Sequence, residues 1–317
     1  MTADAGGAPA RPRQAALSAR RLLVMTAQGL ISDRRERRDE RMHFPRTGRS
    51  TSLRNLDPRI RRPVFVLGAP RSGTTFLGSC IGALPETSYH FEPRVTKAAA
   101  RQVHEGTWSE ERAARVFRRT YGLLQVASGE GGRRFVEKNP ENCFVVPFLV
   151  RAFPDARFVQ IIRDGRDVAV SHAEKPWLSA RAAEDGGHGR AGNAWGPWAR
   201  WWVEPERAEE FASAGDLTRT AWAWRRFTEA ARGHLAELAP ERVLTMRYED
   251  VVTDPETAAV TLARFLGHEE PPEPLRQALL RADPRSIGRW RRSLDAAGIA
   301  DVENEAGALL RELGYTS

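Results

Sequence analysis

Short apolar runs alternate with segments of helical pattern from about residue 62 onward. Runs at 63–67, 133–138, 156–163 and 242–248 predict four strands, because each is short and rich in β-branched or aromatic residues. A helix-compatible segment follows each run. Strands that alternate with helices favour an α/β domain with a central, mainly parallel sheet that helices cover on both faces.

Capping residues place several of the expected helices. Pro140 suits the first turn of a helix that runs to about Ala152. Asp254 is a good N-cap for a helix with Pro255 at its first position, and Gly267 ends that helix. The segment 164–172 opens a further helix. These boundaries define one main domain, which we place at residues 61–317.

Two segments do not follow this pattern. Residues 1–60 are rich in arginine and lack periodicity, so we expect an irregular or partly helical basic arm, with a nucleic-acid-binding tail as the alternative. Residues 174–215 are rich in glycine and then in tryptophan, which indicates an insertion or long loop. Three interpretations of its tryptophans are open: a helical stripe in the core, a wall for an apolar or sugar acceptor, or a contact with a membrane surface. They are Trp195, Trp198, Trp201 and Trp202.

Composition limits the possible cellular location and partners of the protein. The 317 residues, 41% of them hydrophobic, can bury one large core or two modest ones. No apolar run approaches the roughly 18 residues of a membrane span, and the apolar segment 22–30 is too short and interrupted for a signal peptide, so we expect a cytoplasmic protein. Cys80 and Cys143 are expected to be buried thiols, and no Cys/His spacing indicates zinc.

The basic residues are unusual in kind. A net charge of +8 indicates an anionic partner. Lysine, however, occurs only at Lys97, Lys138 and Lys175, and every other basic residue is arginine. Arginine clusters therefore carry little information in this chain, whereas each lysine is a candidate for a specific role.

The segment "GAPRSGTT" (68–75) predicts a phosphate site. A strand, a glycine-rich turn and a helix start direct backbone N–H groups and the positive end of a helix dipole to one point. Gly68 and Gly73 have the spacing of a nucleotide-binding P-loop, but Thr74 stands where that loop has lysine. No strand ends in a convincing metal-binding aspartate, which argues against ATP hydrolysis. The expected phosphate contacts are Arg71, Ser72, Gly73, Thr74 and Thr75.

Two separated motifs carry a resemblance to a known family. "PRSGTT" resembles the 5′-phosphosulfate loop of PAPS-dependent sulfotransferases, and "IIRDGRDVAVS" resembles their 3′-phosphate signature, with Arg163 and Ser171 eight residues apart. The alternative for the second motif is a solvated, charged helix start. The resemblance covers about residues 62–294. It implies a three-layer P-loop sulfotransferase fold, PAPS as the donor and no metal.

Neighbouring residues look most like the tyrosylprotein branch and its bacterial relatives. Glu92 lies 21 residues after Arg71, where that branch has its catalytic base, and "EKNP" places Lys138 at the branch's lysine. The resemblance implies that Lys138 and Arg71 stabilise the leaving oxygen. It also implies donor contacts at Lys175, at Tyr248 in "RYEDVVTDP" and at Ser286 in "SIGRW". At the branch's own serine position this chain has Gly288.

The base assignment has an alternative. In an extended segment His90 and Glu92 point to the same side, and cytosolic sulfotransferases use a histidine base. Glu92 can also be explained as an ion-pair partner of Arg94 or of an arginine at the donor site. Glu137 alternates to the other strand face and is expected to be a structural partner.

These observations predict transfer of a sulfuryl group from PAPS to a hydroxyl or amine acceptor. A peptide tyrosine, carbohydrate, lipid or secondary metabolite all remain possible, and we favour a small molecule or glycan. We expect no specific nucleic acid partner. The competing hypotheses are a P-loop nucleotide kinase, a non-catalytic nucleotide-binding fold and a basic nucleic-acid-binding protein.

Overall fold

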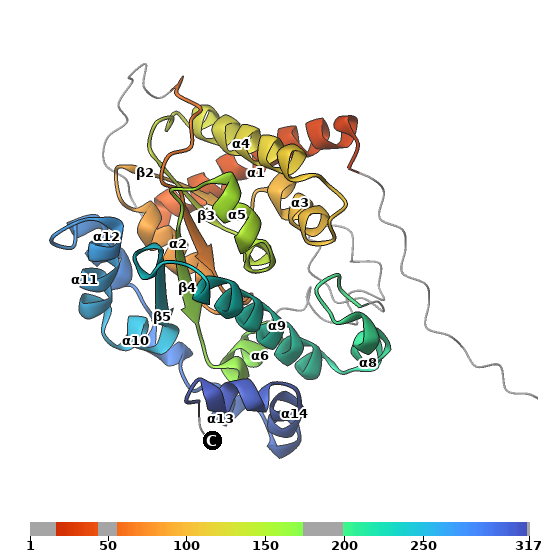
Figure 1. The fold of residues 1–317 in the computed structure, drawn as a ribbon. Helices are drawn as coiled ribbons and strands as arrows, with labels where there is room; N and C mark the ends of the chain where they lie inside the picture. Colours follow the sequence, from red (N-terminus) through yellow and green to blue (C-terminus); the bar gives the residue numbers. More distant parts are fainter. Residues whose placement is uncertain (1–16, 44–55, 174–198, 316–317) are drawn as a thin grey trace, which may run out of the picture. The chain divides into compact units, whose positions relative to one another are not determined.

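The structure, a computed structural model, describes residues 17–43, 56–173 and 199–315 (Figure 1). They contain a parallel five-stranded sheet with the order β2-β3-β1-β4-β5. The predicted α/β fold with a mainly parallel sheet is confirmed. The four predicted strands are all present, and a fifth, β2, was not predicted. The strands are β1 (Val64–Leu67), β2 (Thr87–Phe91), β3 (Arg134–Lys138), β4 (Arg157–Ile162) and β5 (Val243–Arg247).

The described chain divides into two compact units. The first, here called the sheet unit, comprises residues 17–163 and 227–284. The second, called the helical unit, comprises the described parts of 164–226 and 285–317. Helix α9 (Asp216–Ala236) contributes residues to both.

Strand β1 is the centre of the sheet unit. All four of its residues are buried, because it pairs with β3 on one side and β4 on the other and is covered on both faces. The next two strands in the chain, β2 and β3, lie on one side of β1, and the last two, β4 and β5, lie on the other. Such a reversal of strand order is where parallel sheets bind ligands, at the carboxyl ends of the strands.

One face of the sheet is covered by α2 (Thr74–Gly82). It contacts β1, β2 and β3, and α12 (Glu273–Leu279) packs on it with α11 (Pro255–Leu266) behind. Gly78 makes the close approach possible, since a Cβ added there would lie 2.6 Å from the Tyr89 ring of β2. Cys80 on this helix is a buried free thiol, as is Cys143, which confirms that prediction.

The opposite face carries an aromatic cluster. Phe65 of β1 stacks on Phe158 with ring centroids 5.6 Å apart, and Tyr121 of α4 (Glu110–Ala127) lies 4.3 Å from Phe135. The helix predicted from Pro140 to Ala152 is two elements, a 3₁₀ helix η2 (Pro140–Phe144) and α5 (Val146–Ala152). Val145, with φ −128°, interrupts it.

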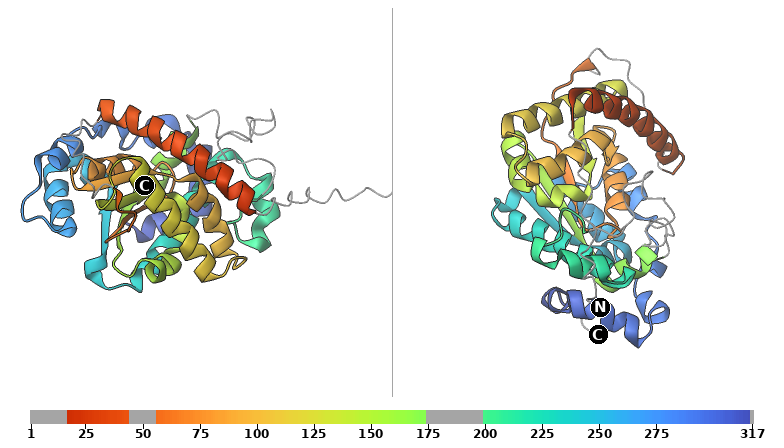
Figure 2. Two further views of the ribbon diagram at one scale, coloured as in Figure 1. Left: turned by 90° about the horizontal axis from the view of Figure 1, so that it is seen from above. Right: turned by 90° about the vertical axis from the view of Figure 1, so that its right-hand side faces the viewer.

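Helix α1 (Ala19–His43) belongs to the sheet unit, where it contacts β2, α4 and α3 (Arg94–His104) (Figure 2). This part of the predicted basic arm is therefore helical and packed. Residues 1–16 and 44–55 of the arm lie outside the described residues. Within the described ranges, no helix combines the length and apolarity needed to cross a membrane. The sheet unit also contains η6 (Pro240–Arg242) and α10 (Tyr248–Thr253).

The helical unit has its own aromatic core. Phe211 of α8 (Ala208–Ser213) contacts Trp202 and Trp222 edge-on, with ring centroids 5.6 Å and 5.4 Å away. Trp202 is thus a core residue, but it lies in a turn rather than in the helical stripe of one alternative, and Trp201 is half-buried. Trp195 and Trp198 lie outside the described residues. The unit also contains α6 (Gly165–Ala173), η5 (Pro205–Arg207), α13 (Trp290–Ser293) and α14 (Ala296–Glu312). The short helix η7 (Pro284–Ser286) contributes residues to both units.

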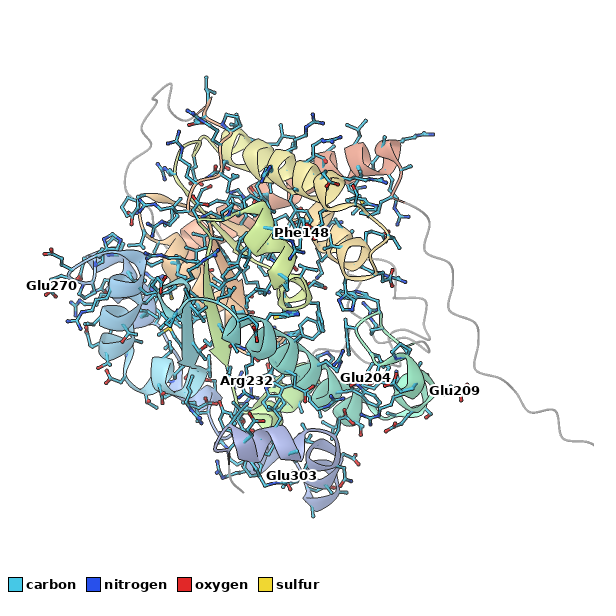
Figure 3. All side chains as sticks on the ribbon, viewed as in Figure 1. Phe148, Glu204, Glu209, Arg232, Glu270 and Glu303 are labelled. Atoms are coloured by element: carbon cyan, nitrogen blue, oxygen red, sulfur yellow. The ribbon has the colours of Figure 1, made fainter. Side chains whose placement is uncertain are left out.

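Ion pairs reinforce this core. The Arg225 guanidinium donates to Glu204 at 2.8 Å and lies 2.7 Å from Glu305 of α14. Glu303 of the same helix pairs with Arg166 at 3.4 Å (Figure 3, where Glu204 and Glu303 are labelled). Carboxylates from two segments thereby bind the arginines of α6 and α9.

A buried carboxylate joins four elements of the sheet unit. Glu137 of β3 accepts hydrogen bonds from Tyr121 of α4 (2.6 Å), Asn142 of η2 (2.6 Å) and Thr96 of α3 (3.1 Å). Its role as a structural partner is as expected. Burial raises the pKa of Glu137 to about 7, although the three hydrogen bonds lower it.

The Gly78 contact predicts opposite effects for two glycine substitutions. Gly78→Ala should lower the free energy of unfolding by about 1 to 3 kcal/mol, because its methyl group collides with Tyr89. Gly233→Ala on α9 should raise it by about 0.5 to 1 kcal/mol, because nothing lies within 4 Å of the added Cβ and alanine favours the helix. Urea denaturation measures both. Equal effects would contradict the packing of α2 on β2.

The raised pKa of Glu137 predicts a pH-dependent stability. The folded state holds the proton more tightly than the unfolded state, so this contribution is complete below the unfolded pKa and is lost as pH rises through about 7. Between pH 5 and 8 the wild type should lose on the order of 3 kcal/mol relative to Glu137→Gln. A pH-independent difference in the free energy of unfolding between the two proteins reflects the hydrogen bonds that the substitution alters. Denaturation at several pH values tests this, with the exposed Glu237→Gln as a control that should follow the wild type.

Candidate active site

The loop between β1 and α2 is shaped by two glycines. Gly68 has φ 150°, and a Cβ there would lie 2.5 Å from the Ile161 carbonyl oxygen of β4. Gly73 has φ 89° and lies against Tyr248, whose ring would be 2.4 Å from an added Cβ. Any other residue at either position is strained and collides. The loop is therefore held tightly between β4 and the start of α10.

This loop has the groups needed to bind an anion. The N-terminus of α2 has no side-chain cap, so its first N–H groups and its dipole are directed at the loop. The Ser72 hydroxyl oxygen is buried and has no hydrogen-bond partner among the described residues, which is uncommon for a buried polar atom. Thr74 is buried and Thr75 is exposed. A phosphate in this position would satisfy both the hydroxyl and the N–H groups.

Arg163 and Tyr248 lie beside the loop. Arg163, which directly follows β4, is 5% exposed and donates to the Arg71 carbonyl at 3.2 Å. Its guanidinium carbon lies 4.5 Å from the centre of the Tyr248 ring, a cation–π contact. Arg71 itself is exposed. The structure thus brings together three residues that the sequence assigned to donor binding.

A second cluster forms at the ends of β2 and β3. Glu92 directly follows β2, and its N–H donates to the Lys138 carbonyl at 2.8 Å. The Lys138 ammonium donates to Glu92 Oε1 and lies 4.5 Å from the centre of the Phe91 ring. The Lys97 ammonium of α3 donates to the other oxygen, Glu92 Oε2, at 2.5 Å. Two of the three lysines in the chain therefore bind one carboxylate.

The two ammonium groups determine the charge of Glu92. Burial by itself would raise the pKa of Glu92, but the charges of Lys138 and Lys97 outweigh it and lower the pKa below its ordinary value. Glu92 is thus a carboxylate at neutral pH. It pairs with these lysines, rather than with Arg94 as the ion-pair alternative proposed. Lys97 was not predicted, although its rarity and its place one turn into the helix after Glu92 were available signals.

Backbone strain marks the same residues. Within the described part of the chain, three non-glycine residues have positive φ, namely Arg62 (42°), Arg71 (71°) and Glu92 (39°). Such conformations cost of order 1 to 3 kcal/mol and concentrate at functional sites. Two of the three are residues to which the sequence assigned catalytic roles.

The alternative base, His90, has a different environment. It is completely buried, its Nδ1 lies 2.9 Å from Asp33 of α1, and its Nε2 lies 2.8 Å from the Ser88 hydroxyl. The structure differs from the expectation that His90 and Glu92 share one side. β2 ends at Phe91, and the positive φ of Glu92 breaks the strand alternation on which that expectation depended.

The helical unit holds the other described donor-site candidates. Ser171 is buried on α6, and Ser286 is half-buried at the end of η7. Asp167 of α6 accepts hydrogen bonds from the backbone N–H groups of Gly288 (2.7 Å) and Trp290 (3.0 Å). The segment that contains Ser286 is thereby bound to the helix that carries Ser171.

The predicted 3′-phosphate site is only partly described. Arg166 and Asp167 are each 1% exposed, so the start of α6 is not the solvated charged segment of the alternative interpretation. Arg163 belongs to the sheet unit and Ser171 to the helical unit, so their joint binding of one phosphate remains a prediction. Lys175 lies outside the described residues. Among the described residues, no His, Cys, Asp and Glu side chains form a cluster suited to a metal ion.

Two curated proteins are similar to part of this chain. A curated relative, protein-tyrosine sulfotransferase A of Caenorhabditis elegans, is 29% identical over 131 residues, which are 37% of this chain and 34% of that protein. An uncharacterized protein of Aquifex aeolicus is 32% identical over 130 residues, 36% of this chain and 17% of that protein. The matched segments thus span about a third or less of these relatives.

Solved structures with similar folds were also found. The sulfotransferase domain from the curacin biosynthetic pathway has a TM-score of 0.49 at 17% identity, with 81% of this chain and 99% of that chain covered. Mouse sulfotransferase SULT7A1, solved with PAP, has a TM-score of 0.47 at 15% identity, with 84% and 92% covered.

The family model described as "Sulfotransferase family" matches residues 63–272, which is more than half of the chain. The matched region contains the loop of β1, both lysines that bind Glu92, and Arg163 with Tyr248. The chain therefore belongs to the sulfotransferase family.

Proposed function

We propose that this sulfotransferase takes its sulfuryl group from PAPS and transfers it to a hydroxyl or amine acceptor, with Glu92 as the general base. The Glu92 carboxylate between Lys138 and Lys97 carries the proposal. Because the sheet is parallel, this cluster and the loop after β1 lie at the same edge of the sheet unit. A base and cations thus share that edge with an anion-binding loop.

The donor would be held by two sets of residues. The backbone of the loop, the unpartnered Ser72 hydroxyl and the threonines of α2 would bind the 5′-phosphate. The 3′-phosphate is assigned to Arg163, Ser171 and Lys175, on the basis of the sequence resemblance. Tyr248 and Ser286 are assigned to the nucleotide on the same basis. The structural support concerns the 5′-phosphate: the loop has the unpartnered hydroxyl and the helix N-terminus that a phosphate would bind.

The residues have distinct tasks in the transfer. The acceptor oxygen or nitrogen forms a bond to sulfur as the bond from sulfur to the bridging oxygen of the donor breaks. Glu92, charged in the folded protein, would accept the acceptor's proton. Lys138 and Arg71 would stabilise the negative charge that develops on the bridging oxygen. We propose a small molecule or a glycan as the acceptor, and a peptide tyrosine as the alternative.

Donor binding separates this function from that of a nucleotide kinase. The protein should bind adenosine 3′,5′-bisphosphate (PAP) in the presence of EDTA, measured by calorimetry. Arg163→Met should weaken this binding roughly 10- to 100-fold, because a charge-assisted hydrogen bond to phosphate contributes about 1.5 to 3 kcal/mol. The partly exposed Arg276→Met, whose guanidinium pairs with Glu256 and Glu273, serves as the matched control. Binding of ATP with Mg²⁺ but not of PAP would refute the proposal.

Replacement of the base should separate binding from turnover. Glu92→Gln should keep PAP affinity within a few-fold and lower sulfuryl transfer about 10²- to 10⁴-fold. Turnover is measured as the release of PAP from PAPS in the presence of a panel of hydroxyl and amine acceptors. Glu105→Gln, which removes a carboxylate paired with Arg101 on the protein surface, is the matched control. Unchanged turnover in Glu92→Gln would refute the base assignment, and loss in His90→Gln alone would transfer it to His90.

A further inference from the structure

The two oxygens of Glu92 have different partners. Oε1 accepts from Lys138, whose side chain is 5% exposed, and Oε2 accepts from Lys97, whose side chain is 24% exposed. The first lysine belongs to β3 and the second to α3. The carboxylate is thus bound from two separate elements.

Lys138 has two tasks in the proposed mechanism. Its ammonium has three N–H donors, so it can bind Glu92 and the leaving oxygen together, but one positive charge is then shared between two negative groups. Partial burial favours the neutral form of a carboxyl group, and a protonated Glu92 is no base. A second cation that stays with the carboxylate would keep it charged during the transfer.

We propose that Lys97 is this second cation, a positioning residue that keeps Glu92 charged and fixes one of its oxygens while Lys138 acts on the donor. This inference rests on the proposed function and adds a residue to it. With Oε2 held by Lys97, Oε1 is the oxygen left to accept the acceptor's proton.

The surrounding structure fixes Lys97 relative to Lys138. Thr96, its neighbour on α3, donates to Glu137, which is the neighbour of Lys138 on β3, at 3.1 Å. The Lys97 N–H donates to the Pro93 carbonyl at 2.9 Å, in the first turn of the helix that begins just after Glu92. Hydrogen bonds on both sides thus hold the two lysines and the carboxylate in one arrangement.

Other charged groups among the described residues also lie near this cluster. Glu141 of η2 lies 3.6 Å from the Lys97 ammonium and partly offsets its charge. Arg94 of α3 is exposed. Lys138 and Lys97 are the charges that lower the pKa of Glu92. Removal of Lys97 therefore leaves Lys138 as the principal cation at Glu92, and its charge is shared with the donor once the donor is bound.

The test compares Lys97→Met with Lys97→Arg and with Arg101→Met. Arg101 lies one turn further along α3 and pairs with Glu105, so its replacement removes a charge without touching Glu92. In the PAP complex, the Glu92 carboxyl pKa is measured by ¹³C NMR, with Glu92→Gln identifying the resonance. The pH dependence of kcat is measured in parallel, and circular dichroism verifies that each variant is folded.

Lys97→Met should raise the Glu92 pKa by about 1 to 3 units and shift the acidic limb of kcat to higher pH. Its PAP affinity should stay within about threefold of the wild type, and Lys97→Arg should restore both readouts at least in part. An unmoved Glu92 pKa, or an equal shift in Arg101→Met, would overturn the inference while PAP binding stays intact. Failure of the wild type to bind PAP would overturn the proposed function and this inference with it.

Discussion

The carboxylate of Glu92 between two ammonium groups is the interaction on which the site depends. It exists because β2 and β3 pair in a register that sets Phe91 opposite Lys138. A slip of one residue would turn Lys138 to the other face of the sheet. The hydrogen bonds of Glu137 join β3 to α3, α4 and η2, and so place Lys97 of α3 near Lys138. The ion pairs are thus a product of sheet pairing and of one buried carboxylate.

The same sheet positions the anion-binding loop. Strand order reverses at β1, so the loop after β1 and Arg163 after β4 lie next to each other. Gly73 allows Tyr248 to lie against this loop, and Tyr248 in turn supports the guanidinium of Arg163. Residues from three distant parts of the sequence therefore meet at this loop.

The sequence predicts those features that depend on local pattern. Apolar runs identified four strands, and the glycine spacing with Arg163 identified the loop and its neighbour. β2 was missed because "TSYHF" mixes polar and aromatic residues, and because the buried Ser88 and His90 also depend on the tertiary partners Glu130 and Asp33. The break at Val145 likewise follows from packing, for which a single sequence has no local signal. The rarity of Lys97 and its place in the helix after Glu92 were signals, but its contact with that carboxylate depends on how α3 packs.

A buried and a half-buried glutamate in the sheet unit have opposite electrostatic environments. Glu137 lies within β3, where neutral donors surround it and burial raises its pKa to about 7. Glu92 lies one residue beyond β2, where two ammonium groups outweigh burial and lower its pKa. Carboxyl groups whose environments shift their pKa values in opposite directions indicate different roles. In the proposed mechanism the base is Glu92 rather than Glu137, because Glu92 lies just beyond β2, at the carboxyl ends of the strands, where parallel sheets bind ligands.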